Sequence, residues 1–360
     1  MRIAQVAPLM ESCPPRLYGG TERVVSFLTE ELVRLGHDVT LFASGDSRTL
    51  AALEAGCHTA LRLDERCKDP LVHHLAMLHR VRQRAHQFDI LHFHTDYLHF
   101  PLFADRPDNT LTTLHGRLDL PDLPIMMREF AMMPLISISD AQRRPIPWAN
   151  WCGTVLHGLP DYLRPGDGGG RYLAFLGRIS PEKGPDRAIA IACRAGLPLR
   201  IAAKVDRVDR DYFEATIRPL LDNPLVEFIG EIGDHEKARF LGEAAALLFP
   251  IDWPEPFGLV MIEAMATGTP VIALRYGSVP EIVEDGLTGF IVDDVESAAE
   301  AVPRALGLDR SAIRRRSRER FSAERMALDY LSLYERVLSG TGRRDFPRAP
   351  RRVATREAAE

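Results

Sequence analysis

The sequence predicts an α/β fold with two doubly wound domains, each a parallel sheet covered by helices on both faces. Three observations lead to this prediction. The chain has 360 residues, and at about 150 residues per domain this length favours two domains. Short apolar runs, typical of buried strands, alternate with amphipathic helix patterns. The two halves also begin alike, each with a strand, a glycine-bearing loop, a helix and a second strand.

The first of these units lies at the N-terminal end. Residues 3–7 are apolar and predict a strand, and Gly19 and Gly20 follow in a loop. Residues 21–35 then place apolar side chains on one helical face. Residues 37–43 predict the next strand, so the unit has the order expected of a parallel sheet.

The second unit begins near the middle of the chain. Residues 172–176 predict a strand, and the loop GRISPEKG follows at residues 177–184. Pro185 suits the first position of a helix and Gly196 suits the position after its end. Residues 199–203 predict the next strand.

These patterns divide the chain into five segments. We expect an N-terminal domain at residues 1–160, a linker rich in Gly, Pro and Asp at 161–170, and a second domain at 171–321. A final amphipathic helix is predicted at 322–339. The polar tail at 340–360 has almost no apolar content, so we expect it to be disordered.

Composition and charge exclude several classes of protein. The formal net charge of -5 argues against nucleic acid as a partner, because neutralising phosphates requires a broad basic surface. The five cysteines are scattered without a C-x-x-C pair, which predicts neither a disulfide framework nor a cysteine metal site. No apolar run approaches the ~18 residues that span a bilayer. The first residues lack the features of a signal peptide, so we expect a cytoplasmic protein.

The strongest functional signal is PEPFGLVMIEAMATGTPVIA at residues 254–273. Residues 258–266 predict a helix that follows a proline-rich turn. A helix N-terminus offers free N–H groups and the positive end of the helix dipole, which suits a diphosphate. Glu255 precedes this helix and Glu263 lies inside it.

The spacing of these two glutamates excludes a glycosidase pair. Eight residues of continuous helix span ~12 Å, beyond the ~5–9.5 Å that separates the two carboxyl groups of a glycosidase. Carboxylates accept hydrogen bonds from hydroxyl groups. We therefore expect Glu255 and Glu263 to bind two hydroxyl-bearing parts of one elongated ligand.

Five segments form a specific set: GGTER at 19–23, LTTLHG at 111–116, GRISPEKG at 177–184, PEPFGLVMIEAMATGTPVIA at 254–273 and VPEIVEDGLTGFIV at 279–292. Together they resemble the retaining glycosyltransferases of family 4, also called glycosyl transferases group 1, over nearly the whole chain up to about residue 338. The resemblance implies the GT-B architecture, in which two facing Rossmann-like domains enclose a deep cleft. It also implies that the final helix crosses back onto the first domain.

The activity implied by this resemblance is sugar transfer from a nucleotide-diphosphate sugar to an acceptor hydroxyl, with retention of anomeric configuration. The leaving phosphate accepts the proton of the acceptor, so neither a protein base nor a metal or cofactor is expected. The acceptor is a carbohydrate, a lipid-linked molecule or a small molecule. The donor sugar and base, the acceptor, the linkage and the oligomeric state stay open.

The resemblance assigns the diphosphate to four residues. Arg178 and Lys183 match the pair of cations that binds it, and Gly19 and Gly20 match a first-domain loop that closes on the leaving phosphate. Cations and N–H donors at this place stabilise the charge that grows as the glycosidic bond breaks.

Further residues are assigned to the sugar and the nucleoside. Glu255 matches the residue that binds the donor sugar, and Glu263 the one that holds the ribose diol. Glu231 lies in the loop expected near the base, and residues 288–290 lie where relatives approach ribose or phosphate. His115 matches the active-site histidine of the first domain. The backbone N–H groups expected beside the donor are those of Phe257, Gly258, Leu259 and Val260.

Two positions depart from the pattern of the family. The segment AAKVD at residues 202–206 stands where relatives commonly carry glycines, which brings Lys204 within reach of the nucleotide. Ser278 stands where the second of two glycines is frequent.

Two other functions are alternatives. His92, His94 and Asp96 form H-x-H-x-D, a spacing similar to that of zinc-dependent hydrolases of the metallo-β-lactamase type. The next position is Tyr97 instead of a further histidine, so we favour a place for His94 and Asp96 on the acceptor side of the cleft. The other alternative is a protein that binds a sugar nucleotide without catalysis.

Residues 70–88 combine apolar positions at helical spacing with several His and Arg. Core packing with a basic exposed face is the favoured interpretation. Peripheral contact with the cytoplasmic face of a membrane is the alternative, both for this segment and for the arginine-rich tail.

Overall fold

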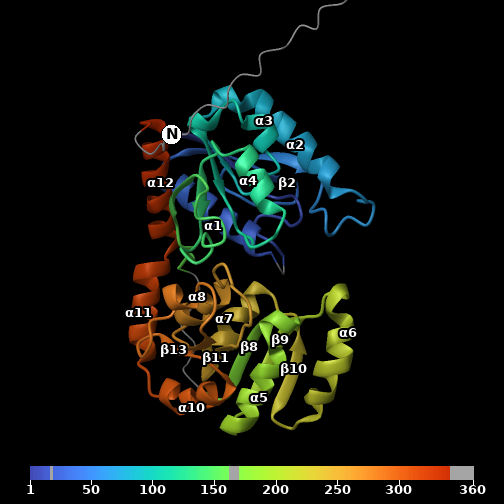
Figure 1. The fold of residues 1–360 in the computed structure, drawn as a ribbon, viewed down its shortest axis with the longest axis vertical. Coiled ribbons are helices and arrows are strands. Elements are labelled where there is room, and N and C mark those ends of the chain that lie inside the picture. Colours follow the sequence, from blue (N-terminus) through green and yellow to red (C-terminus); the bar gives the residue numbers. More distant parts are fainter. Residues whose placement is uncertain (17–18, 162–169, 341–360) are drawn as a thin grey trace, which may run out of the picture.

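The computed structural model describes residues 1–16, 19–161 and 170–340, and its two parallel sheets lie in separate lobes (Figure 1). The sheet of the first lobe has the order β3-β2-β1-β4-β5-β6-β7. The order of the strands reverses between β1 and β4. The carboxyl ends of these two strands form a switch point, where a doubly wound fold binds ligands. The strands are β1 (Arg2–Val6), β2 (Asp38–Ser44), β3 (Ala52–Cys57), β4 (Ile90–Phe93), β5 (Thr110–Thr113), β6 (Leu135–Ser137) and β7 (Trp151–Thr154).

Helices cover the centre of this first sheet, where the strands are buried on both faces. β1 and β4, for example, bury every residue except Arg2. The Asp69 side chain caps the second helix by accepting the Leu71 N–H, and Pro70 occupies its first position. The helices of this lobe are α1 (Gly20–Arg34), α2 (Pro70–Arg84), α3 (Phe100–Phe103) and α4 (Leu123–Glu129).

The second lobe repeats the same winding. Its sheet has the order β10-β9-β8-β11-β12-β13, again with parallel neighbours and a reversal, here between β8 and β11. Its strands are β8 (Leu173–Arg178), β9 (Leu199–Lys204), β10 (Val226–Gly230), β11 (Ala246–Phe249), β12 (Val271–Leu274) and β13 (Gly289–Val292). Its helices are α5 (Pro185–Ala195), α6 (Arg210–Tyr212), α7 (Asp234–Gly242), α8 (Leu259–Ala266), α9 (Val279–Ile282), α10 (Val295–Leu306) and α11 (Arg310–Phe321).

Short 3₁₀ and π segments complete the connections. The 3₁₀ segments are Ala85–Gln87, Pro107–Asn109, Pro181–Lys183, Arg207–Asp209 and Arg218–Asp222, and the π segment is Phe213–Ile217.

The last helix, α12 (Ala323–Leu338), lies against the first lobe, whereas α11 before it lies against the second (Figure 1). Tyr330 and Tyr334 of α12 are fully buried. The Tyr334 hydroxyl lies 2.7 Å from Nδ1 of His92, and the Tyr330 hydroxyl lies 3.0 Å from Oγ1 of Thr113. The last helix of the described chain therefore completes the core of the first lobe.

The prediction of an α/β fold with two parallel sheets is confirmed. Most of the predicted linker, residues 162–169, and the predicted tail at 341–360 lie outside the described residues. None of the described helices combines the length and the apolar content needed to cross a membrane.

Candidate active site

A pocket of about 490 Å³ opens between the two lobes, in the size range of small-molecule sites. Strands of both sheets end at it: Arg178 closes β8, and His115 follows β5. The pocket brings together twelve of the fourteen residues predicted for the site. These are Gly19, Gly20, His115, Arg178, Lys183, Glu231, Glu255, Phe257, Gly258, Leu259, Val260 and Glu263.

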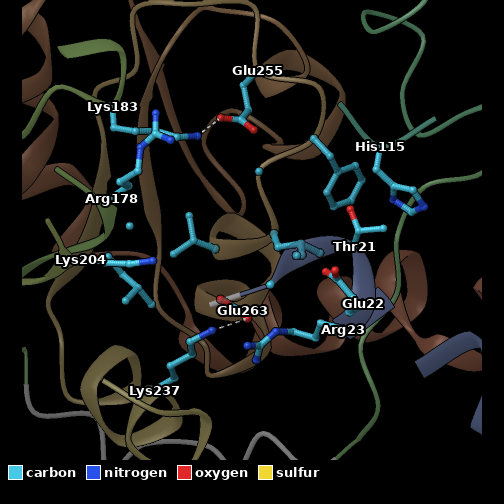
Figure 2. A pocket seen from close by; sticks show the side chains of 18 of the residues that line it. Thr21, Glu22, Arg23, His115, Arg178, Lys183, Lys204, Lys237, Glu255 and Glu263 are labelled. Atoms are coloured by element: carbon cyan, nitrogen blue, oxygen red, sulfur yellow. Dashed lines mark hydrogen bonds and ion pairs between the residues drawn. The ribbon is translucent and has the colours of Figure 1, made fainter. Parts of the chain in front are cut away.

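The two predicted diphosphate cations lie on the second-lobe wall (Figure 2). Arg178 forms ion pairs with Glu182 at 2.5 Å and with Asp209 at 3.2 Å. Lys183 forms an ion pair with Glu255, and its Nζ lies 5.0 Å from the centre of the Trp253 ring. Each cation is thus held by carboxylates in a place where a ligand phosphate can compete for it.

The loop that carries Glu255 leads into α8. Gly258 is the N-cap of this helix at φ +82°, a left-handed conformation, and an added Cβ would lie 2.7 Å from Cε of Met261. The predicted helix therefore starts one residue later than expected, at Leu259. Glu255 lies outside the helix, held by the indole N–H of Trp253 at 3.1 Å.

Glu263 lies at a different place in the pocket, beside Lys237 (Figure 2). Nζ of Lys237 is 3.4 Å from Oε1 of Glu263 and 3.3 Å from Oδ1 of Asp234. Asp234 also forms an ion pair with Arg23 of the first lobe. Sequence reasoning missed Lys237, since it lies in a polar helix pattern with no motif around it.

His115 lies on the first-lobe wall and begins a chain of buried hydrogen bonds. Its Nε2 is 2.8 Å from Nδ1 of His94, and Nε2 of His94 is 2.8 Å from Oε1 of Gln5. Burial lowers the pKa of His115 to about 3. The imidazole that faces the pocket is therefore neutral.

The surroundings of His92 argue against the alternative of a zinc-dependent hydrolase. Its two ring nitrogens are occupied within the protein, Nδ1 by the Tyr334 hydroxyl at 2.7 Å and Nε2 by Oγ1 of Thr113 at 2.8 Å. Both nitrogens of His94 are likewise engaged. Within the three described ranges, no three His, Cys, Asp or Glu side chains are grouped so that they could hold a metal ion.

Two predicted acceptor-side residues are placed elsewhere. Neither His94 nor Asp96 is among the described residues that line the pocket. His94 is 1% exposed and lies behind His115, which covers it. Asp96 occupies a turn at φ +49° and is exposed. A place for these two residues on the acceptor side of the cleft stays a prediction.

Residues 288–290 are also not among the described pocket residues, so their approach to ribose or phosphate stays a prediction. Gly289 pairs with Val271 in the sheet, so closely that an added Cβ would lie 1.9 Å from the Val271 oxygen. The glycine in this motif is required by strand packing.

The first-lobe wall also contains carboxylates that sequence reasoning did not assign. Glu22 accepts the Glu11 N–H at 3.3 Å, and burial raises the pKa of Glu22 to about 7. Glu11 pairs with Arg62 at 2.9 Å. Glu22 belongs to the quoted segment GGTER, so its place two residues after Gly20 was the available signal. Lys204, expected near the nucleotide, does line the pocket and pairs with Asp206 at 2.8 Å.

Two family models match the chain, one in each half. The description "Glycosyltransferase Family 4" matches residues 18–156, and "Glycosyl transferases group 1" matches residues 165–323.

Curated relatives match over part of their length. The chain is 36% identical over 174 residues to D-inositol 3-phosphate glycosyltransferase of Streptomyces griseus, covering 41% of this chain and 36% of the relative. It is 29% identical over 269 residues to the enzyme of that name from Mycolicibacterium smegmatis, covering 66% of this chain and 58% of the relative. The matches thus span between about a third and three fifths of the relatives' own length.

Solved structures show the same fold. AviGT4, a glycosyltransferase involved in avilamycin A biosynthesis, superimposes with a TM-score of 0.73 at 24% identity, covering 94% of this chain and 98% of that one. HepE of Anabaena, solved with UDP and glucose, gives a TM-score of 0.69 at 20% identity, covering 93% and 99%. With its fold shared by glycosyltransferases and both halves matched by their family models, the chain belongs to glycosyltransferase family 4, the glycosyl transferases group 1.

Proposed function

We propose that the protein is a retaining glycosyltransferase that moves a sugar from a nucleoside-diphosphate sugar to an acceptor hydroxyl. One observation carries this proposal: Arg178, Lys183, the N-terminal end of α8 and His115 all line the same interlobe pocket. Had these groups pointed to separate places, the pocket would have offered no site for a departing diphosphate.

The second-lobe wall would bind the diphosphate. In the structure Lys183 pairs with one carboxylate, that of Glu255. A diphosphate carries more negative charge than a carboxylate, so it competes for the Lys183 ammonium, and Arg178 can bind it bidentately. Release of Glu255 from Lys183 then frees that carboxylate for the hydroxyls of the donor sugar.

The reaction needs no protein base in this scheme. The bond between the anomeric carbon and the phosphate oxygen breaks while the acceptor oxygen bonds to the same face of that carbon. The acceptor proton passes to the departing phosphate oxygen. The positive side chains stabilise the charge on the diphosphate, and closure of the lobes excludes water.

The neutral imidazole of His115 is suited to hydrogen bonding with a hydroxyl near the reacting carbon, because burial keeps it uncharged. Glu263 would bind the ribose diol and Glu231 would lie near the base. Gly19 and Gly20 would let the first-lobe backbone approach the leaving phosphate.

A ligand panel tests the proposal. Thermal shifts with UDP, GDP and ADP, then with their sugars, should show one base that raises the melting temperature, because a ligand that binds only the folded state stabilises it. HepE structures contain UDP, which makes UDP the first probe. No shift with any of the three diphosphates would contradict the proposed donor site.

Turnover separates an enzyme from a binding protein. The donor that shifts the melting temperature, labelled in its sugar, should be hydrolysed slowly without acceptor and transferred faster when an acceptor is present. The names of the curated relatives make inositol 3-phosphate one acceptor to include. We also propose that neither a metal nor a cofactor takes part, so turnover should persist in excess EDTA. Tight binding without any turnover would favour the non-catalytic alternative.

We propose, second, a cytoplasmic location with peripheral membrane contact through the start of α2. Leu78 and Val81 of α2 are buried, but Leu71, Val72 and Leu75 are 47%, 60% and 45% exposed. Exposed apolar side chains on a helix with a basic end can enter the headgroup region of an anionic bilayer. Co-sedimentation with phosphatidylserine-containing vesicles should be lost in Val72→Ser. Equal sedimentation of both proteins would remove this proposal.

A further inference from the structure

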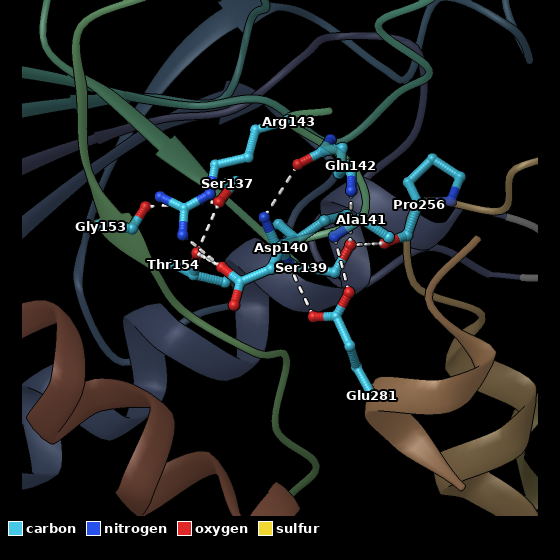
Figure 3. Close-up of polar contacts among 11 residues, drawn as sticks. Ser137, Ser139, Asp140, Ala141, Gln142, Arg143, Gly153, Thr154, Pro256 and Glu281 are labelled. Carbon is cyan, nitrogen blue, oxygen red and sulfur yellow. Dashed lines mark hydrogen bonds and ion pairs between the residues drawn. The ribbon is translucent and has the colours of Figure 1, made fainter. Parts of the chain in front are cut away.

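We propose that an interlobe clasp sets the Glu255 loop against the His115 loop, and that its residues position the site without touching substrate. The clasp consists of Ser139 and Gln142 of the first lobe with Ser278 and Glu281 of the second (Figure 3 shows all but Ser278). This inference rests on the proposed function for what the clasp positions. The contacts themselves are independent of it.

The first contact is made by Glu281 at α9. Its carboxylate accepts two successive backbone N–H groups of the other lobe, those of Asp140 at 2.7 Å and Ala141 at 2.6 Å (Figure 3). Hydrogen bonds to a charged acceptor are about twice as strong as neutral ones, and two of them in parallel fix direction as well as distance. Glu281 therefore binds the backbone of this turn in one orientation.

The second contact lies one residue earlier in the same turn. Oγ of Ser139 donates to the carbonyl oxygen of Pro256 at 2.6 Å and accepts the Gln142 N–H at 3.0 Å. Ser139 is fully buried. Pro256 lies directly after Glu255, so this bond attaches the first lobe to the loop that carries the donor-sugar carboxylate.

Ser278, the N-cap residue of α9, binds the two backbone carbonyls on either side of the Pro256 carbonyl. Its N–H donates to the Glu255 oxygen at 2.9 Å, and its hydroxyl donates to the Phe257 oxygen at 2.8 Å. Three successive carbonyls of the loop are therefore held, the outer two by Ser278 and the middle one by Ser139. Gly277 at φ +52° permits this approach, since an added Cβ would lie 2.3 Å from the Glu255 oxygen.

Gln142 extends the clasp to His115. Its Nε2 donates to the Leu114 and Gly116 oxygens, each at 2.9 Å, and its Oε1 accepts the Ile138 N–H at 2.9 Å. The two carbonyls flank His115 on both sides. Gln142 is 5% exposed, so breaking these bonds would leave buried polar groups unpaired.

These contacts form one continuous path between the two walls of the pocket. It runs from the backbone on either side of His115, through Gln142 and Ser139, to the backbone next to Glu255. A misplacement of ~1 Å between reacting groups can cost ~100-fold in rate. Because the path crosses between lobes, it acts only when the lobes are closed. Loss of the clasp should therefore lower the population of the closed state, with a smaller effect on the intrinsic affinity for nucleotide.

Two variants test the clasp. Glu281→Gln keeps the shape but presents an NH₂ group to one backbone N–H, and Ser139→Ala removes the bond to Pro256. Each should lower kcat about 10-fold, while the Kd for UDP changes less than about 3-fold. Arg143→Ala is the matched control, since among the described residues this side chain pairs with Asp140 alone, on the solvent side of the same turn. The control should behave as the wild type.

A second readout does not depend on turnover. With UDP present, small-angle X-ray scattering should give a larger radius of gyration for Glu281→Gln than for the wild type and Arg143→Ala. Wild-type kcat and radius of gyration in both clasp variants would overturn the inference. If the wild type itself binds no nucleotide, the proposed function fails, and scattering without nucleotide still decides whether Glu281 holds the lobes together.

Discussion

The two walls of the pocket differ in how pairing and burial affect their ionisable side chains. On the second-lobe wall the ionisable side chains form ion pairs, as in Lys183 with Glu255 and Lys237 with Glu263. On the first-lobe wall burial favours the neutral forms, with a pKa of about 3 for His115 and about 7 for Glu22. Figure 2 shows Arg178, Lys183 and Lys204 on one side and His115 and Glu22 on the other, with Arg23 beside Glu22. The first-lobe wall also carries charged pairs, such as Glu11 with Arg62, but the part of it around His115 is suited to hydroxyl groups.

The physical origin of this difference is desolvation. A buried charge costs free energy unless a partner offsets it, and otherwise the pKa shifts until the group is neutral. The second lobe supplies partners for its cations, which a diphosphate can replace. Around His115 the first lobe supplies hydrogen bonds between neutral rings and an amide, which hold this imidazole in place.

The largest expected effect comes from removing a charge on the second-lobe wall. Lys183→Ala should lose ~100-fold or more in kcat, because the leaving diphosphate loses a cation. Steady-state kinetics with the identified donor measures this. Arg194→Ala removes an exposed cation from α5 outside the pocket and should leave kcat unchanged. Near-normal kcat in Lys183→Ala would take Lys183 out of the diphosphate site.

The next effect concerns a neutral group of the first-lobe wall. Folding raises the pKa of Glu22 from 4.5 to about 7, so between these values the folded state holds a proton that the unfolded state has released. The contribution of Glu22 to the free energy of unfolding of the wild type is therefore fully present below about pH 4.5. It declines as the pH rises to about 7. Glu22→Gln avoids this decline and should be more stable at pH 8 by on the order of 2 kcal/mol.

Denaturant unfolding of both proteins across this pH range measures the difference. The gain should disappear near pH 4, where both side chains are neutral, so the wild type is its own control. A gain that is the same at pH 4 and pH 8 would show that Glu22 is not the titrating group.

A smaller effect is expected from the imidazole on the same wall. His115→Ala should lower kcat/KM about 10-fold, a loss of ~1.4 kcal/mol, because one hydrogen bond to a neutral hydroxyl is removed. The Kd for UDP, measured by calorimetry, should stay the same. His79→Ala on the exposed face of α2 is the control. A weakened UDP Kd in His115→Ala would contradict the division between the two walls.

The smallest effect should come from the end of the histidine network. Tyr334→Phe removes a hydroxyl that lies 2.7 Å from Nδ1 of His92 and accepts from Gln5 at 3.0 Å. Gln5 also lies 3.4 Å from Nδ1 of His92 and can bond to it instead, so we expect a stability loss of about 1 kcal/mol. Chemical unfolding measures the loss. An unchanged stability would mean that the hydroxyl contributes nothing to this network.

Sequence patterns predicted the second-lobe wall better than the first. Its cations and glutamates lie in short, continuous motifs, GRISPEKG and PEPFGLVMIE, where neighbours along the chain are neighbours in space. The parallel sheets followed from the alternation of strand and helix patterns for the same reason, since it is a local property of the chain.

The groups that the sequence patterns missed, and the surroundings of some that they named, depend on contacts between distant segments. Lys237 meets Glu263 only because α7 packs beside α8. His94 is buried and bonds to His115, which lies 21 residues later, after the neighbouring strand β5. The clasp joins Ser139 to Pro256 across 117 residues. The sequence showed Ser278 as a departure from the family pattern. Its role in the clasp could not be predicted, because it depends on contacts with the Glu255 and Phe257 carbonyls.

The place of α12 has a consequence for how the chain is made. Its Tyr330 and Tyr334 fill the core of a lobe whose strands are translated first. During synthesis the first lobe therefore lacks part of its core, and it can complete this core only after the second lobe has been synthesised. A circularly permuted gene that encodes α12 ahead of β1 would remove this delay.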